Sequence, residues 1–244
     1  MNLVIDQGNT ISKLGVFNAG EMIARFTEPE LNISVLLTLF EKYPEISRAI
    51  LSSVSKFSAD IPEFLEKNLK SFIILNAETP LPIKNTYYTK ESLGYDRIAD
   101  AVGAFTIFPG NNVLVIDAGT AITIDLLTAK GEFYGGNISP GLDLRLRSLH
   151  EFTKKLPLVE KKEEYPVLGK NTREAILAGV LNGVGFELDG YINTLKSHYH
   201  DLKIILTGGD IKFFDKKLKN SIFVHSNLNL TGLNRILEYN VKNN

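Results

Sequence analysis

Residues 3–11 read Leu-Val-Ile-Asp-Gln-Gly-Asn-Thr-Ile, and residues 114–122, 111 positions later, read Leu-Val-Ile-Asp-Ala-Gly-Thr-Ala-Ile. Each copy is an apolar run that ends in Asp-x-Gly, with a second β-rich run close behind it at residues 14–17 and 122–127. Two apolar runs joined by a glycine-containing turn predict a hairpin of two buried strands. The sequence therefore predicts two related halves, each built on such a hairpin.

The similarity between the halves continues beyond the hairpins, at offsets that shift along the chain. Strands are expected at 49–54 and 203–209, helices at 61–69 and 211–218, and further strands at 71–76 and 221–227. We interpret the chain as two α/β repeats, an N-terminal domain of residues 1–112 and a C-terminal domain of residues 113–244. Ligands usually bind in the cleft that two facing half-domains form.

A second pair of matching segments separates the two halves chemically. Residues 94–98 read Gly-Tyr-Asp-Arg-Ile and residues 232–236 read Gly-Leu-Asn-Arg-Ile, and each segment is expected to open a helix. Asp and Asn are both good residues at a helix start, so a purely structural role would accept either. Only the first copy has a carboxylate, Asp96, where the second has Asn234. This difference indicates that the N-terminal half carries the chemistry.

A long helix is expected at residues 172–199, after an irregular segment at 151–170. Asn171 and Glu174 fit its cap and third position. Another irregular segment is expected at 77–93, which contains two prolines.

The composition excludes several classes of function. The chain has 44% hydrophobic residues, 23% charged residues and a formal net charge of −1, so we expect no nucleic-acid partner. It has no cysteine, which excludes disulfides, thiolate catalysis and cysteine-bound zinc. We see neither a signal peptide nor an apolar run long enough to span a bilayer, and expect a cytoplasmic protein with no membrane partner.

Two Asp-Gly hairpins in register suit a nucleotide. Glycine lets backbone N–H groups approach a phosphate, and an aspartate at a strand end can hold a cation. A polyphosphate needs both kinds of group. One such hairpin alone would be an ordinary turn, whereas the duplicated pair predicts ATP binding.

Six motifs, in order along nearly the whole chain, resemble those of type III pantothenate kinases. The motifs are Asp6-x-Gly8-Asn9-Thr10-x-x-Lys13, Gly94-x-Asp96-Arg97, Asp117-x-Gly119-Thr120-Ala121-x-Thr123-x-Asp125, Gly135-Gly136-x-Ile138-x-Pro140-Gly141, Asn171-Thr172 and Thr207-Gly208-Gly209-Asp210. That family resembles acetate and sugar kinases, Hsp70 and actin. The resemblance implies two tandem ribonuclease-H-like α/β domains with an ATP-binding cleft between them.

The resemblance also implies the reaction. ATP would phosphorylate pantothenate to 4′-phosphopantothenate, the first step of coenzyme A biosynthesis, with Mg²⁺ and a monovalent cation, K⁺ or NH₄⁺, as cofactors. A neutral primary alcohol is a poor nucleophile, so a carboxylate within hydrogen-bond reach is needed to accept its proton. Asp96 is the candidate base, and its alternative role is that of a helix N-terminal residue favoured by the helix dipole.

The candidate pantothenate contacts follow from the same resemblance. They are Tyr87, Gly94, Tyr95, Asp96, Arg97 and Thr172. Arg97 can bind the pantothenate carboxylate through two hydrogen bonds, although a surface helix arginine is the alternative. Tyr88 competes with its neighbour Tyr87 for the tyrosine role, and Thr172 could instead cap its helix.

The candidate ATP and metal ligands come from the two hairpins. The ATP-binding set is Asp6, Gln7, Gly8, Asn9, Thr10, Ile11, Ser12, Lys13 and Thr120. Asp6 is also a candidate Mg²⁺ ligand, directly or through water. Lys13 could reach a phosphate or face water at a strand edge. Asp117 resembles the family's monovalent-cation ligand, and Asp125 could orient its hairpin or be a buried, partnered carboxylate.

Two glycine-rich segments remain open in their role. Residues 135–141 either approach the nucleotide or bend before a helix, and residues 207–209 either meet the adenosine or form a strand-to-helix turn.

The resemblance implies a homodimer, with the helix at 172–199 as its interface. The helix has apolar residues on more than one side, which a well-buried helix within one chain would also have. They are Leu181, Val184, Phe186, Leu188, Ile192 and Leu195.

Three other functions fit parts of the pattern. The chain could be another kinase of the superfamily acting on a sugar or acetate, a non-enzymatic transcriptional accessory factor of the same fold, or an ATPase switch of the actin or Hsp70 type. The presence of both Asp96 and Asp117 argues against the accessory factor.

Overall fold

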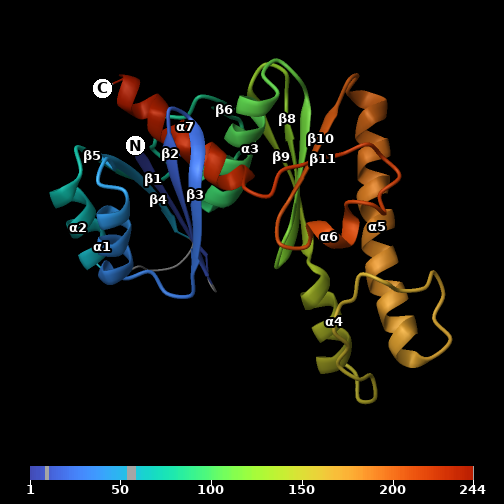
Figure 1. Ribbon diagram of the computed structural model, residues 1–244. Helices are drawn as coiled ribbons and strands as arrows, with labels where there is room; N and C mark the ends of the chain where they lie inside the picture. The colour runs from blue at the N-terminus through green and yellow to red at the C-terminus, as the bar shows by residue number, and fades with distance from the viewer. Residues whose placement is uncertain (9–10, 54–58, 244) are drawn as a thin grey trace. The chain divides into compact units, whose positions relative to one another are not determined.

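The computed structural model describes residues 1–8, 11–53 and 59–243. These residues form two compact α/β units (Figure 1). The first unit comprises Met1–Pro109, Gly131–Phe133 and Asn227–Asn244, and the second comprises Gly110–Lys130 and Tyr134–Ser226.

The first unit contains a five-stranded sheet in the order β3-β2-β1-β4-β5. Its strands are β1 (Asn2–Gln7), β2 (Ser12–Asn18), β3 (Glu21–Glu28), β4 (Arg48–Ser53) and β5 (Ser71–Ile74). β1, β2 and β3 pair antiparallel, whereas β4 runs parallel to β1 and β5 runs parallel to β4. This order and these directions confirm the predicted ribonuclease-H-like arrangement.

Helices cover both faces of that sheet. Leu3 and Ile5 of β1 share one core with α1 (Ile33–Lys42) and α2 (Asp60–Asn68). Because side chains alternate along a strand, Asp6 points to the other face, where α3 (Tyr95–Ile107) and α7 (Leu228–Asn243) contact the sheet. Asp6 and the start of α3 therefore lie on the same side of the first sheet.

α3 and α7 pack closely because both carry glycine at their contact. A Cβ atom at Gly232 of α7 would overlap the carbonyl oxygen of Ala99, and one at Gly103 of α3 would lie 2.6 Å from the carbonyl oxygen of Leu228. The prediction that Gly232 opens the C-terminal helix was wrong, because α7 begins four residues earlier, at Leu228. Gly232 is a close-packing residue inside the helix.

The second sheet repeats the topology of the first in the order β11-β10-β7-β8-β9, and β6 (Lys84–Asn85) extends it by pairing with the start of β9. Its strands are β7 (Val113–Ala118), β8 (Ala121–Leu127), β9 (Glu132–Pro140), β10 (Lys203–Thr207) and β11 (Phe223–Val224). As in the first sheet, the central strand pairs antiparallel with the next strand and parallel with a later one. The predicted duplication is thus confirmed at the level of topology.

The core of the second unit lies between this sheet and α4 (Leu142–Glu151), α5 (Thr172–His198) and α6 (Ile211–Phe214). Leu114 and Ile116 of β7 point into that core, so Asp117 points to the opposite face. α6 is shorter than the helix expected at 211–218, and β11 has two residues where seven were expected.

α5 begins as predicted, since Asn171 caps it by accepting a hydrogen bond from the Glu174 N–H at 3.0 Å. Four of its apolar residues, Leu181, Val184, Leu188 and Ile192, are fully buried in the core of the second unit. By length and composition α5 could cross a membrane, so the expectation that no segment meets that criterion was wrong. Half of its most apolar window is buried, as in the core helix of a globular protein.

The sequence offset of 111 holds only as far as the glycine of each hairpin. Gln7 pairs with Ser12 across the first turn, whereas Ala118 pairs with Ile122 across the second, so the first turn is one residue longer. The match between Ile11 and Ile122 is therefore not structural. Ile11 lies in the turn and is 40% exposed, whereas Ile122 is buried in β8.

The compact units differ from the predicted division at residue 112, since Gly131–Phe133 and Asn227–Asn244 both belong to the first unit. α7 belongs to the first unit because it packs against α3, although its sequence lies in the second half. The division of the chain into two repeats at residues 111–113 stays a prediction.

Candidate functional site

The first group of candidate residues gathers where β1 ends. Asp6 pairs in register with Lys13 of the antiparallel strand β2 and with Ser52 of the parallel strand β4. Residues in register on neighbouring strands point to the same face, so Asp6, Lys13 and Ser52 share one side of the sheet.

Burial and a second carboxylate shift the pKa of Asp6. Burial raises the pKa of Asp6 from its ordinary 3.8 to about 6, and the positive charge of Lys13 opposes this shift. The charge of Asp96 contributes to the same rise in pKa, which means that the two carboxylates lie close enough to repel each other. The fold thus brings together Asp6 and Asp96, which are 90 residues apart in the sequence.

The start of α3 holds Asp96 in a defined position. Gly94 caps the helix, and a side chain there would overlap Oδ1 of Asp96. The same oxygen accepts a hydrogen bond from the N–H of Arg97 at 2.8 Å. Asn229 of α7 donates to the carbonyl oxygen of Asp96 at 3.4 Å. The carboxylate is thus held in the first turn of the helix, and Tyr95, beside it, is half-buried.

Arg97 is buried, with 5% of its surface exposed, which excludes the alternative of a surface arginine. Its guanidinium carbon lies 5.5 Å from the ring centre of Tyr87 and 6.0 Å from that of Phe133. Cations at this distance from aromatic rings gain favourable electrostatic energy. Tyr88 is fully exposed, so the structure brings Tyr87, and not its neighbour, to Arg97.

Oxygen atoms beside Asp6 fit a hard cation. The hydroxyl of Ser52, which shares the face of Asp6, is buried and has no hydrogen-bond partner within the described part of the chain. Oε1 of Gln7 is also buried without such a partner, but Gln7 is the next residue of β1 and alternates to the opposite face. Mg²⁺ prefers oxygen ligands and usually binds one or two carboxylates together with substrate phosphates. Among the described residues no group of three or more His, Cys, Asp or Glu could hold a metal ion.

The first turn is described only in part. The N–H of Gly8 donates to the carbonyl of Ile11 at 3.1 Å, and Ser12 is buried at the start of β2. Asn9 and Thr10, two of the predicted ATP ligands, lie outside the described residues.

The second group of candidates lies where β7 ends. Asp117 pairs in register with Thr207 of β10, as Asp6 pairs with Ser52 in the first unit. Gly208 has a φ of +99° and approaches so closely that a Cβ atom would overlap Oδ1 of Asp117 and the carbonyl of Ala118. Only glycine fits there, so the backbone at Gly208 can approach the carboxylate of Asp117 closely.

Thr120 is exposed in the turn after Asp117, and Gly141 packs against the backbone of that turn. The N–H of Gly141 donates to the carbonyl of Thr120 at 3.0 Å. A Cβ atom at Gly141 would overlap the carbonyl oxygens of both Gly119 and Thr120. Residues 135–140 continue β9, so the glycine-rich segment is a strand that ends against this turn and not only a bend before α4.

The structure also defines the surroundings of Asp125 and Thr172. Asp125 is 3% exposed and has a partner, and a side chain at Gly136 would come within 2.7 Å of its Oδ1, so the carboxylate is enclosed between β8 and β9. Thr172 is exposed in the first position of α5, whose cap is Asn171, so the alternative of a capping role for Thr172 was wrong.

Sequence reasoning missed Ser52 and Phe133. Ser52 could have been found from the duplication, since Leu-Ser at 51–52 matches Leu-Thr at 206–207 and each hydroxyl residue pairs with the aspartate of its hairpin. Phe133 lies beside Arg97 through the pairing of β9 with β6, and no local pattern indicates that contact.

Comparison with known proteins identifies a family for the chain. The profile of the type III pantothenate kinase family matches residues 2–194. A type III pantothenate kinase of Phocaeicola vulgatus is 46% identical over 242 residues, covering 99% of this chain and 100% of the relative. One from Bacteroides fragilis is 44% identical and covers 98% of each chain.

Solved structures share the fold. A Campylobacter jejuni protein described as a Baf family transcriptional activator superposes with a TM-score of 0.62 and 25% identity, covering 98% of this chain and 99% of that one. The ROK hexokinase of Thermus thermophilus superposes with a TM-score of 0.54 and 13% identity, covering 98% and 99%.

Proposed function

Because the chain belongs to the type III pantothenate kinase family, we propose that it phosphorylates pantothenate with ATP, giving 4′-phosphopantothenate for coenzyme A biosynthesis. The observation that carries this proposal is that Asp6 and the start of α3 lie on the same side of the first sheet, near enough for the charge of Asp96 to raise the pKa of Asp6. Lys13 is in register with Asp6, and Arg97 follows Asp96 in the chain. One carboxylate can bind the metal ion, and the other can accept the proton of the acceptor alcohol.

Asp96 is the general base. It accepts the proton of the substrate hydroxyl as the bond from that oxygen to phosphorus forms. The helix dipole favours an ionised carboxylate in the first turn of α3, and the N–H of Arg97 orients it.

Arg97 binds the carboxylate of pantothenate. A guanidinium can donate two parallel hydrogen bonds to a carboxylate. The guanidinium of Arg97, in the first turn of α3, lies against the rings of Tyr87 and Phe133. Tyr87, Gly94 and Tyr95 line the same segment, and Thr172 is a further substrate contact.

Asp6 holds Mg²⁺, directly or through water, with the hydroxyl of Ser52 on the same face of the sheet. A Mg²⁺ ion held there would supply positive charge that offsets the charge developing on the phosphate oxygens. The turn from Gly8 to Ser12 and the ammonium group of Lys13 contact the phosphates of ATP.

In the second unit, Thr120 contacts ATP and Asp117 binds a monovalent cation, K⁺ or NH₄⁺. The exposure of Thr120 and the close approach of Gly208 to Asp117 support these roles. The carboxylate of Asp117 and nearby carbonyl groups are oxygen ligands of the kind that such cations bind.

The protein acts in the cytoplasm as a homodimer, without nucleic-acid or membrane partners. α5 contributes to the dimer interface, since Phe186 and Tyr191 leave 62% and 38% of their surfaces exposed. Exposed large apolar side chains often mark an interaction surface.

The test is ADP release that depends on pantothenate, measured with and without K⁺. We expect release only when pantothenate is present, with a higher rate in K⁺ than in Na⁺. N-acetylglucosamine and acetate serve as matched acceptors. ADP release with either of these but not with pantothenate would assign the chain to another kinase activity, and no release with any acceptor would favour a non-enzymatic role.

A further inference from the structure

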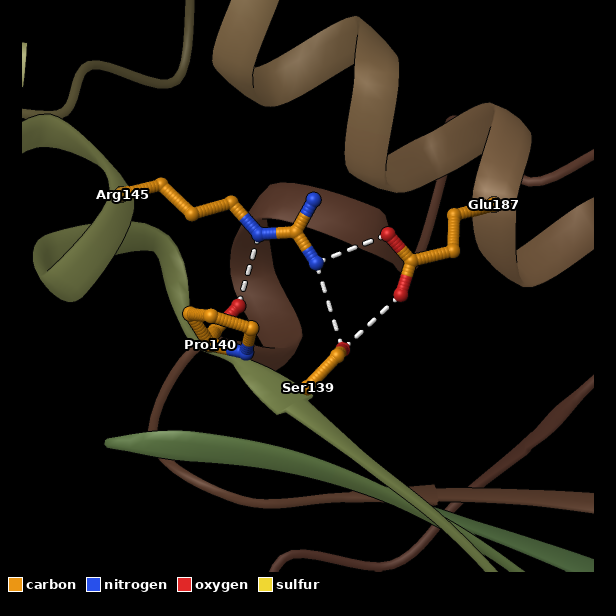
Figure 2. A network of polar contacts seen from close by, with 4 residues as sticks. All are labelled: Ser139, Pro140, Arg145 and Glu187. Atoms are coloured by element: carbon orange, nitrogen blue, oxygen red, sulfur yellow. Dashed lines mark hydrogen bonds and ion pairs between the residues drawn. The ribbon is translucent and has the colours of Figure 1, made fainter.

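A polar network joins three elements of the second unit at the end of β9. Arg145 of α4 and Glu187 of α5 form an ion pair at 2.7 Å, and their side chains are about three-quarters buried (Figure 2). Ser139 donates to Glu187 at 2.8 Å and accepts from Arg145 at 3.2 Å. None of these three residues belongs to the catalytic or ligand-binding groups described above.

Arg145 also holds the backbone at the end of the strand. Its Nε donates to the carbonyl oxygen of Pro140 at 2.7 Å (Figure 2), and its main-chain N–H donates to the carbonyl oxygen of Gly141 at 3.0 Å. One residue thus binds two consecutive carbonyl groups. Glu187 fixes the guanidinium group, because a group that donates to both Glu187 and Pro140 has little freedom to rotate.

The backbone that Arg145 holds supports the turn with Thr120. The N–H of Gly141 binds the carbonyl of Thr120, and the two segments are so close that Gly141 has no room for a side chain. A shift of Pro140 and Gly141 therefore moves the turn. α4 and α5 already pack together through the apolar core. If the ion pair only joined these two helices, the hydrogen bond to Pro140 would have no part in that role.

We propose that Arg145 and Glu187 are positioning residues for nucleotide binding, which hold Gly141 against the turn of Gly119 and Thr120. This role rests on the proposed function, in which that turn contacts ATP. Small displacements of such a turn reduce binding, because its hydrogen-bond groups must match the phosphates closely.

The experiment is titration calorimetry of Mg·ADP with the full-length protein. Arg145→Lys keeps the charge but cannot bind Glu187 and Pro140 together. We expect the Kd for Mg·ADP to rise about tenfold in Arg145→Lys and in Glu187→Ala, and no further in the double variant, because both changes break the same chain of contacts. The KM for pantothenate at saturating ATP stays unchanged. Ser139→Ala, which removes one hydroxyl, gives a smaller rise.

The matched control is Lys212→Gln, which breaks the exposed ion pair of Lys212 with Glu163, 3.1 Å long, in the same unit. It leaves the Kd for Mg·ADP unchanged. A lower melting temperature in the Arg145 and Glu187 variants with unchanged Mg·ADP affinity would overturn the proposal and leave only an ion pair that joins α4 and α5. If these variants do not fold, Ser139→Ala decides, and unchanged affinity there overturns it as well.

The outcomes separate this proposal from the proposed function. Wild-type protein that binds Mg·ADP but does not phosphorylate pantothenate would overturn the function alone. Wild-type protein that does not bind Mg·ADP would overturn both.

Discussion

At the scale of single residues, the fold clearly shifts the pKa of Asp6. Burial, against the opposing charge of Lys13 and with the added charge of Asp96, raises its pKa to about 6. A carboxyl group whose pKa is higher in the folded than in the unfolded state binds protons more tightly when folded. Ionising Asp6 therefore destabilises the free protein.

The sign of this effect gives a pH-dependent prediction for Asp6→Asn. Below pH 3.8 Asp6 is protonated in the folded and the unfolded state, and it does not lower the free energy of unfolding. Above about pH 6 it is ionised in both states, and it lowers the free energy of unfolding by the full amount. We expect Asp6→Asn to be more stable than wild type by roughly 2–3 kcal/mol at pH 8 and about equal at pH 4. Urea unfolding without metal or nucleotide at both pH values measures the difference.

The exposed carboxylate of Asp215 supplies the control for that experiment. Asp215→Asn should change stability little at either pH, because exposed charges interact mainly with water. A stability gain for Asp6→Asn that is the same at pH 4 and pH 8 would contradict the assigned cause.

Residue roles could be predicted from sequence where a motif is local, and not where a contact is distant. Asp6-x-Gly8 and Gly94-x-Asp96-Arg97 identified the candidates. Burial of Arg97 beside Phe133 depends on the pairing of β6 with β9, in which Asn85 pairs with Phe133, 48 residues later in the chain. No local pattern contains that information. The choice of Tyr87 over Tyr88 needed the same contact.

Among the elements, the crossing of α3 and α7 depends on glycine. A methyl group at Gly232 would overlap the carbonyl oxygen of Ala99, so Gly232→Ala must separate the two helices. We expect it to lower the free energy of unfolding by about 3 kcal/mol or more, because backbone cannot yield as a flexible side chain can. Urea unfolding at constant pH measures this change.

Gly179 of α5 is the matched control, since nothing lies within 4 Å of the Cβ position there. Gly179→Ala should stabilise the protein by up to about 1 kcal/mol, the ordinary gain from alanine inside a helix. Equal effects of the two substitutions would show that the contact of α3 with α7 is looser than the structure has it.

The elements also show where the duplicated pattern stops predicting structure. The hairpin strands and their neighbours were predicted because apolar runs and glycine turns are local signals. The start of α7 was misplaced because Gly232 matches Gly94 in sequence, whereas Gly94 caps a helix and Gly232 serves helix packing. Glycine thus has two different roles: at Gly232 it leaves room for a neighbouring helix, and at Gly94 it caps a helix.

At the scale of the whole molecule, the family resemblance implies a homodimer, and the apolar composition of α5 suggested that helix as its interface. Most of that composition is explained by the core of the second unit, which leaves Phe186 as the most exposed apolar side chain of the helix. We expect Phe186→Glu to convert a dimer into a monomer, because an apolar contact is replaced by a charge. Size-exclusion chromatography with light scattering measures the molar mass.

Phe152 is 85% exposed and lies directly after α4, which makes Phe152→Glu a suitable control that should remain dimeric. A wild-type protein with the mass of one chain would exclude the homodimer. A dimer that survives Phe186→Glu would place the interface elsewhere than on α5.

The central claim is that Asp96 takes the proton of the acceptor alcohol, and Asp96→Asn tests it most directly. Asn is also a good residue at a helix start, so the fold should persist, and Glu91→Gln on the exposed segment before α3 is the matched control. The measurement is the rate of phosphate transfer to pantothenate, with the affinities for pantothenate and Mg·ADP determined in parallel. We predict that Asp96→Asn loses about 10²–10⁴-fold in turnover with both affinities kept. Turnover close to that of wild type would contradict the account.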